Sequence, residues 1–77
     1  MKKVRIYTNE GCGGCQQAKE YLRKNGIDFE EREIGTDESA RKELEAKGIQ
    51  STPVLEIGGE TVVGFDPGRI EELLKAA

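Results

Sequence analysis

The chain has 77 residues, of which 35% are hydrophobic and 35% charged, with a formal net charge of −3, and this length predicts one compact domain over residues 1–77. The acidic balance argues against nucleic-acid binding, and no apolar run approaches the ~20 residues of a membrane span. No leader-like segment begins the chain, so we expect no signal peptide and a cytoplasmic protein.

The first half of the chain predicts two strands joined by a helix. Alternating polar and apolar residues over 3–8 indicate a first strand. Apolar residues spaced three and four apart indicate a helix from about Gly13 to Asn25, and Gly26 suits the position that follows a helix. The apolar stripe of this helix is Cys15, Ala18, Tyr21 and Leu22. A second strand is expected near residues 28–33.

The middle of the chain predicts a second helix followed by a hairpin. Thr36 is expected to cap this helix, with acidic residues in its first turn, and Gly48 is expected to end it. Residues 53–57 and 60–63 are predicted as the third and fourth strands. Because Gly58-Gly59 suits a two-residue turn, these two strands should pair antiparallel.

Asp66-Pro67 predicts the start of a last helix, with the aspartate as its cap and the proline at the first helical position. The apolar face of that helix is Ile70, Leu73, Leu74 and Ala77. The expected element order is therefore β-α-β-α-β-β-α. A β-α-β opening implies parallel strands, and a closing hairpin adds an antiparallel pair. The predicted fold class is α/β, with a four-stranded mixed sheet flanked by helices.

The two cysteines, Cys12 and Cys15, form a C-x-x-C motif, and the absence of histidine excludes His-dependent catalysis and His metal ligands. A disulfide between them closes too short a loop to stabilise the fold much. A four-thiolate zinc site needs twice as many cysteines, unless two chains share one metal ion. Two roles remain for the motif: dithiol redox exchange, which we favour, and binding of a soft metal ion. Copper-chaperone domains also carry C-x-x-C after a first strand, but their element order is β-α-β-β-α-β.

The position of this motif, at the start of the first predicted helix, favours redox exchange. There the helix dipole and free N–H groups would stabilise a Cys12 thiolate, and Gly13 keeps an N–H that can face its sulfur. Glu10 opposes that charge, so we expect the pKa of Cys12 to lie only moderately below that of a free thiol. Cys15, one turn later, should be less exposed and should resolve the mixed disulfide that Cys12 forms.

Pro53 opens the third predicted strand. A plain strand start, which proline tolerates, is one explanation. The other is a cis Thr52–Pro53 bond that faces the dithiol, although few X–Pro bonds in folded proteins are cis. The residues alone leave both explanations open.

Together these features resemble the glutaredoxins of the thioredoxin superfamily, and among them the small NrdH-type redoxins. The matching segments, in chain order, are Tyr7-Thr8, Cys12-Gly13-Gly14-Cys15, Ala18-Lys19, Thr52-Pro53-Val54, Gly58-Gly59 and Gly64-Phe65-Asp66. The resemblance implies a thioredoxin fold, a nucleophilic Cys12, a resolving Cys15 and a cis Pro53. It implies no required cofactor beyond the redox-active Cys12–Cys15 disulfide, with glutathione as a candidate.

The resemblance further implies a substrate groove beside the dithiol. The predicted substrate-binding residues are Tyr7, Gly13, Gly14, Thr52, Pro53, Gly64, Phe65 and Asp66. The substrates would be disulfide-containing proteins, of which ribonucleotide reductase is one candidate, and the chain would act as a monomer. Electrons would come from thioredoxin reductase or glutathione. Asn9 stands where glutathione-using members commonly carry lysine, and Asp66 has capping of the last helix as an alternative role.

A related alternative is an iron–sulfur protein. Glutaredoxins with glycine at the position of Gly13 can hold a [2Fe–2S] cluster between two chains, with glutathione as co-ligand. The favoured function is a thiol–disulfide oxidoreductase that reduces protein disulfides through Cys12 and Cys15, without a metal site. The electron donor and the protein substrate stay open at this point.

Overall fold

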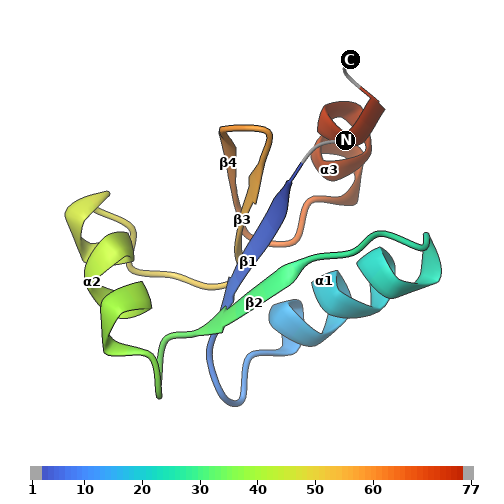
Figure 1. Cartoon of the computed structure of the whole chain (residues 1–77). Helices are drawn as coiled ribbons and strands as arrows, with labels where there is room; N and C mark the ends of the chain where they lie inside the picture. The colour runs from blue at the N-terminus through green and yellow to red at the C-terminus, as the bar shows by residue number, and fades with distance from the viewer. Residues whose placement is uncertain (1–2, 76–77) are drawn as a thin grey trace.

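The computed structural model describes residues 3–75, and these residues form strands and helices in the predicted order (Figure 1). The elements are β1 (Val4–Thr8), α1 (Gly13–Lys24), β2 (Glu30–Glu33), α2 (Glu38–Ala46), β3 (Val54–Ile57), β4 (Glu60–Val63) and α3 (Pro67–Lys75). The predicted order β-α-β-α-β-β-α is therefore confirmed. Within the described residues, no helix is long and apolar enough to cross a membrane.

The strands form the predicted four-stranded mixed sheet, and their order in it is β2-β1-β3-β4. β1 runs parallel to β2, which requires a crossover such as α1 between them, and antiparallel to β3. β3 and β4 form the predicted hairpin. The turn residues Gly58 and Gly59 have φ of 56° and 89°, a left-handed pair that matches the twist of the strands and that other residues rarely adopt.

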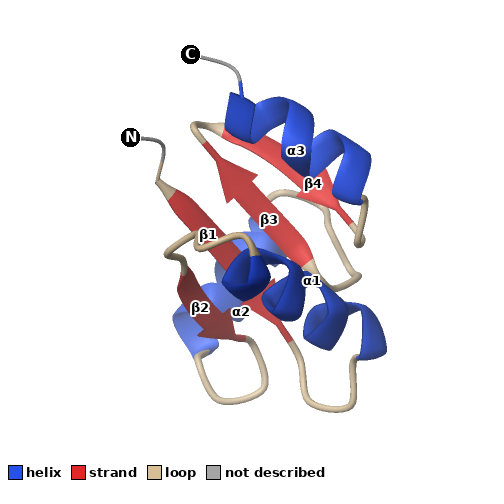
Figure 2. Ribbon diagram, turned by 90° about the vertical axis from the view of Figure 1, so that its right-hand side faces the viewer, coloured by secondary structure: helices blue, strands red, loops and turns tan. Residues whose placement is uncertain are grey.

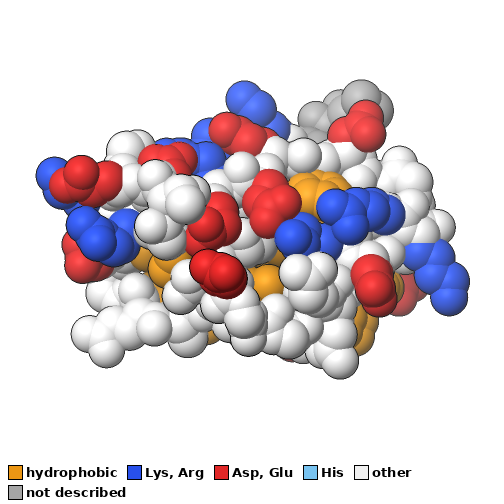
Figure 3. Space-filling view, turned by 90° about the horizontal axis from the view of Figure 1, so that it is seen from below, with side chains coloured by type: hydrophobic (Ala, Val, Ile, Leu, Met, Phe, Trp, Pro, Cys, Tyr) orange, Lys and Arg blue, Asp and Glu red, His pale blue; other side chains and the backbone are white. Residues whose placement is uncertain are grey.

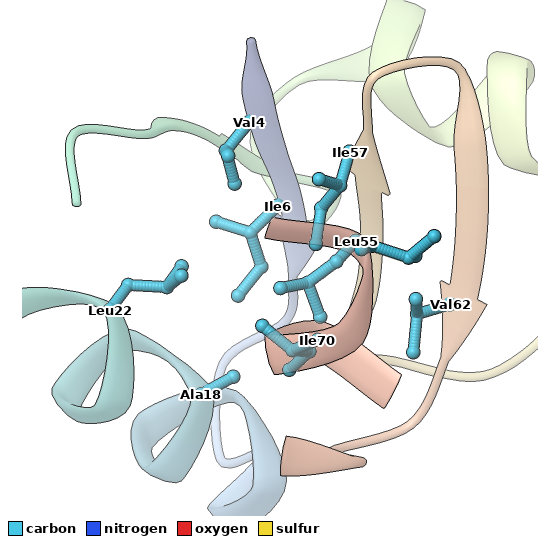
Figure 4. Close-up of a cluster of buried hydrophobic side chains, with 9 residues drawn as sticks. Val4, Ile6, Ala18, Leu22, Leu55, Ile57, Val62 and Ile70 are labelled. Carbon is cyan, nitrogen blue, oxygen red and sulfur yellow. The ribbon is translucent and has the colours of Figure 1, made fainter. Parts of the chain in front are cut away.

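Helices cover both faces of this sheet (Figures 1 and 2). α1 and α3 lie on one face, and α2 lies on the other. The main core lies between the sheet and the α1/α3 layer, and Figure 4 shows its side chains converging from strands and helices. Its buried residues are Val4, Ile6, Ala18, Leu22, Leu55, Ile57, Val62, Ile70 and Leu73. A smaller buried cluster on the α2 side consists of Tyr7, Ala40, Leu44 and Val54.

The ends of α1 and α2 agree with the sequence analysis except at one cap. Gly26 and Gly48, with φ of 67° and 73°, follow the two helices as predicted. The predicted cap at Thr36 is wrong, because the carboxylate of Asp37 accepts the hydrogen bond from the Ala40 N–H at 3.1 Å. Thr36 instead lies in the turn after β2, where its N–H and hydroxyl bond back to the end of that strand.

The start of α3 is as predicted. The Asp66 carboxylate accepts a hydrogen bond from the Arg69 N–H at 3.1 Å, which makes it the cap of this helix. Two residues of the predicted apolar face, Ile70 and Leu73, are buried in the main core. Ala77, which was also assigned to that face, lies outside the described residues.

Candidate active site

Cys12 and Cys15 lie at the N-terminus of α1, after the loop that leaves β1. They form a disulfide, with their Cα atoms 5.2 Å apart. Cys12 is the N-cap residue and is half-buried, whereas Cys15 is only 1% exposed. The predicted difference in exposure between the two cysteines is confirmed.

The sulfur of Cys12 accepts a hydrogen bond from the backbone of the same helix. The donor is the N–H of Cys15, 3.1 Å from Cys12 Sγ, and not the N–H of Gly13 that the sequence analysis suggested. A capping side chain accepts from the second or third helical residue, and Cys15 is the third, so the geometry of the cap explains the difference. The helix therefore directs a backbone donor at the more accessible sulfur.

Three backbone segments meet at this end of the molecule: the first turn of α1, the turn before β3 and the turn after β4. Pro53 is buried against α1, since a Cβ atom added at Gly14 would lie 3.1 Å from Pro53 Cδ. The carbonyl of Pro53 accepts a hydrogen bond from the Gly64 N–H at 2.7 Å. The Thr52–Pro53 bond is cis. The structure thus brings together Gly14, Pro53 and Gly64, which belong to three of the segments predicted for the groove.

The close contact at Gly14 predicts different outcomes for the two glycines of the motif. A Cβ atom at Gly13 meets nothing within 4 Å, so Gly13→Ala should stabilise the first turn of α1 by about 0.5–1 kcal/mol. Gly14→Ala crowds the Pro53 ring and should cost about 1–3 kcal/mol relative to Gly13→Ala. Urea unfolding midpoints of the oxidised variants measure this difference. Equal midpoints would contradict the packing of α1 against Pro53.

The turn between β4 and α3 borders the same region. The half-buried ring of Phe65 packs edge-on against Tyr21 of α1, with 6.0 Å between ring centroids. This contact ties the turn to α1. Asp66 is exposed, and its carboxylate is occupied as the cap of α3, the alternative role that the sequence allowed. Thr52 is half-buried beside Pro53.

Tyr7 does not belong to this site. Its side chain is 0% exposed, and its hydroxyl donates to the Glu43 carboxylate of α2 at 3.2 Å. The Arg32 guanidinium lies 5.9 Å from the ring centroid. Successive strand residues point to opposite faces, so Tyr7 faces α2 whereas its neighbour Ile6 faces α1 and α3. The predicted substrate contact of Tyr7 is therefore corrected, because the side chain has no surface to offer a substrate.

A hollow of about 180 Å³ opens beside Cys15, and the sequence analysis did not predict it. Its lining residues are Thr8, Asn9, Glu10, Cys15, Gln16, Lys19, Glu31 and Glu33. Figure 3 views the molecule from the end that carries the β1–α1 loop and shows acidic side chains between small hydrophobic areas. One signal was present in the sequence: Lys19 follows Cys15 by four residues, a spacing that puts both on one face of a helix.

Glu31 of β2 is the centre of a polar cluster in this hollow. Its Oε2 atom accepts hydrogen bonds from the Thr8 hydroxyl at 2.9 Å and from Lys19 Nζ at 3.0 Å. Burial raises the pKa of Glu31, but the hydrogen bonds from Lys19 and Thr8 outweigh it and hold the pKa below its ordinary value. The carboxylate therefore stays ionised near neutral pH and anchors the Lys19 ammonium.

The disulfide is the redox centre that the structure shows. Both cysteine sulfurs of the chain are joined to each other at the start of α1. Among residues 3–75, no group of three or more histidine, cysteine or acidic side chains is placed to hold a metal ion. Chemically, this pair of sulfurs can take part in thiol–disulfide exchange.

The sequence of this chain is similar to those of known proteins. The family model described as Glutaredoxin matches residues 4–62. An uncharacterized glutaredoxin-like 8.6 kDa protein in the rubredoxin operon of Clostridium pasteurianum is 34% identical over 73 residues, which cover 94% of this chain and 97% of that protein. Glutaredoxin-like protein NrdH of Escherichia coli (strain K12) is 31% identical over 71 residues, covering 92% of this chain and 88% of that protein.

The solved structure of the Escherichia coli NrdH-redoxin superposes with a TM-score of 0.88 at 31% identity, covering 97% of this chain and 99% of that one. A four-stranded mixed sheet with a cysteine pair at the start of its first helix defines a redox protein of the thioredoxin fold. The chain belongs to the glutaredoxin family, and within it the chain is close to the NrdH-redoxins. It shares the general oxidoreductase role of that family.

Proposed function

We propose that this chain is a thiol–disulfide oxidoreductase that reduces disulfides in other proteins. The observation that carries the proposal is the unequal setting of the two sulfurs: Cys12 is half-buried at the N-terminus of α1, and Cys15 is 1% exposed behind it. The Cys15 N–H, 3.1 Å from Cys12 Sγ, would also stabilise a thiolate there. This setting supports Cys12 as the nucleophile and Cys15 as the resolving cysteine.

The proposed reaction has two exchange steps. The Cys12 thiolate attacks one sulfur of a substrate disulfide, and the other substrate sulfur leaves as a thiolate that takes up a proton. Cys15 then loses its proton and attacks Cys12 Sγ. This displaces the substrate sulfur that Cys12 had attacked, and that sulfur is protonated in turn. The substrate gains two electrons and two protons, and the Cys12–Cys15 disulfide forms.

The segments around the dithiol would hold the substrate chain. Gly13 is exposed and Gly14 packs against Pro53, so no bulky side chain of the motif obstructs the approach to Cys12. The backbone of Thr52 would pair with the substrate beside its disulfide. The loop that begins with Gly64 would border the other side, where the ring of Phe65 would supply apolar contact.

We expect thioredoxin reductase, not glutathione, to be the better electron donor. Glutathione carries a net negative charge, and Glu10 and Glu33 line the hollow beside Cys15. Asn9 supplies no cation to a glutathione carboxylate. The related Escherichia coli protein is described as glutaredoxin-like with a thioredoxin-like activity profile, which supports the same preference here.

The donor assay tests this proposal. The oxidised protein is offered NADPH with thioredoxin reductase, or NADPH with glutathione and glutathione reductase, with insulin disulfides as the final acceptor. We expect faster NADPH oxidation and faster insulin reduction with thioredoxin reductase. Faster reduction by the glutathione system would overturn the donor assignment. Intact insulin disulfides with both systems would overturn the oxidoreductase proposal itself.

A further inference from the structure

A charged side chain lies next to the buried cysteine of the motif. Lys19 follows Cys15 by four residues on α1, so their Cβ atoms are expected about 5–6 Å apart on one face of the helix. Long helical side chains lean back over the turn that precedes them, which directs Lys19 toward the turn of Cys15. The Lys19 side chain is only 13% exposed and lines the same hollow as Cys15.

A hydrogen bond to Glu31, which Thr8 also contacts, holds Lys19 in this place. Its Nζ lies 3.0 Å from Glu31 Oε2, and the same oxygen accepts the Thr8 hydroxyl at 2.9 Å. Thr8 is buried at the end of β1, and Glu31 is part of β2. α1, β1 and β2 each contribute one side chain to this hydrogen-bonded cluster. The position of the Lys19 ammonium therefore depends on the sheet as well as on α1.

A positive charge at this point would favour the resolving step. Burial disfavours a thiolate, and the N–H of Cys15 itself is directed at Cys12 Sγ. Lys19 is the cation in the lining of the hollow, and Arg23 acts on Glu31 from one turn further along α1. The acidic groups that face the hollow from the β1–α1 loop and from β2 are Glu10, Glu31 and Glu33. Without Lys19, every charged side chain in the lining of the hollow would be a carboxylate.

We propose that Lys19 stabilises the Cys15 thiolate in the resolving step, with Glu31 and Thr8 as positioning residues that keep its ammonium at the hollow. This inference rests on the proposed oxidoreductase function. In that step the Cys15 proton leaves to water, the Cys15 sulfur bonds to Cys12 Sγ, and the Cys12–substrate bond breaks with its electron pair on the substrate sulfur. The reaction needs no further oxidant or reductant.

The two exchange steps can be timed separately with 5,5′-dithiobis(2-nitrobenzoate). This reagent releases one coloured thiolate when Cys12 attacks it and a second when Cys15 resolves the mixed disulfide. Stopped-flow mixing of the reduced protein with equimolar reagent gives both rates across a range of pH. Lys19→Met removes the charge, and Lys19→Arg keeps it. Lys24→Met removes an exposed charge from the same helix and serves as the matched control.

Loss of the positive charge beside the hollow should raise the pKa of Cys15. A more basic thiolate is also a better nucleophile, so resolution near neutral pH should slow by roughly three- to tenfold. We therefore expect Lys19→Met to slow the second phase about three- to tenfold and to move its pH midpoint upward, while the first phase is unchanged. Lys19→Arg and Lys24→Met should behave like the unmodified chain.

The outcomes separate this inference from the function on which it rests. A second-phase rate in Lys19→Met equal to that in Lys24→Met would overturn the role of Lys19, and so would equal slowing of both phases. If circular dichroism shows that Lys19→Met does not fold, Lys19→Gln replaces it as the neutral variant and is judged by the same rates. If the unmodified chain releases no coloured thiolate at all, the proposed oxidoreductase function fails instead.

Discussion

Replacing Cys12 with serine should abolish the reduction of protein disulfides, whereas replacing Cys15 with serine should stop the reaction halfway. Cys12 is the half-buried cap of α1, and its sulfur accepts a hydrogen bond from the Cys15 N–H. A serine hydroxyl in its place is not ionised near neutral pH and cannot attack a disulfide. Cys15→Ser keeps the attacking sulfur but removes the group that displaces the substrate, so the mixed disulfide should accumulate.

Insulin reduction and non-reducing electrophoresis with mass spectrometry measure these two effects. Cys12→Ser should lose all turnover above the rate without protein, and Cys15→Ser should form a covalent adduct that a reducing agent releases. Gln17→Ala is the matched control, since it changes an exposed side chain of the same helix that does not line the hollow beside Cys15. Full activity in Cys12→Ser, or an adduct formed through Cys15, would show that the assignment of the two roles is wrong.

Replacing Leu55 with alanine should remove a large part of the stability of this small fold. Leu55 is 0% exposed in β3, in the main core that Figure 4 shows. Truncation of a buried leucine typically costs about 2–5 kcal/mol, because apolar contacts are lost and a cavity is left. A 77-residue domain has roughly 4–12 kcal/mol of total stability, so one substitution should move the unfolding transition far toward low denaturant.

Val63→Ala on the neighbouring strand is the control for this loss. Val63 is 54% exposed at the end of β4, so its truncation should change stability by about 0.5 kcal/mol or less. Urea unfolding followed by circular dichroism gives both midpoints. Similar midpoints for the two variants would mean that the α1/α3 side of the sheet does not carry the core described here.

The fold could be predicted from the sequence because its signals are local and agree with one another. Gly26 marks a helix end and Gly58-Gly59 marks a hairpin turn. The next element after each of them is a strand, as expected. The error at Thr36 has a physical cause: Thr36 and Asp37 are both good caps, and only the path of the chain decides which side chain reaches the first turn of α2.

From the residues alone, the site was predictable only where it is contiguous in the sequence, and the segments of Pro53 and Gly64 were expected beside it only through the resemblance. Cys12 and Cys15 could be placed from the motif and the helix that it begins. The pairing of Lys19 with Glu31 depends on how α1 lies over the β1–β2 pair, which no local pattern specifies. The misplacement of Tyr7 was avoidable, because strand alternation already puts it on the face opposite Ile6.

We expect the setting of Cys12 at the start of α1 to make it the reactive thiol. The pH dependence of iodoacetamide alkylation of the reduced chain, with the modified residue identified by peptide mass spectrometry, tests it most directly. Cys12 should be modified first, with an apparent pKa below the value of about 8.5 for a free thiol. Initial modification of Cys15, or an apparent pKa of Cys12 at or above that of a free thiol, would contradict it.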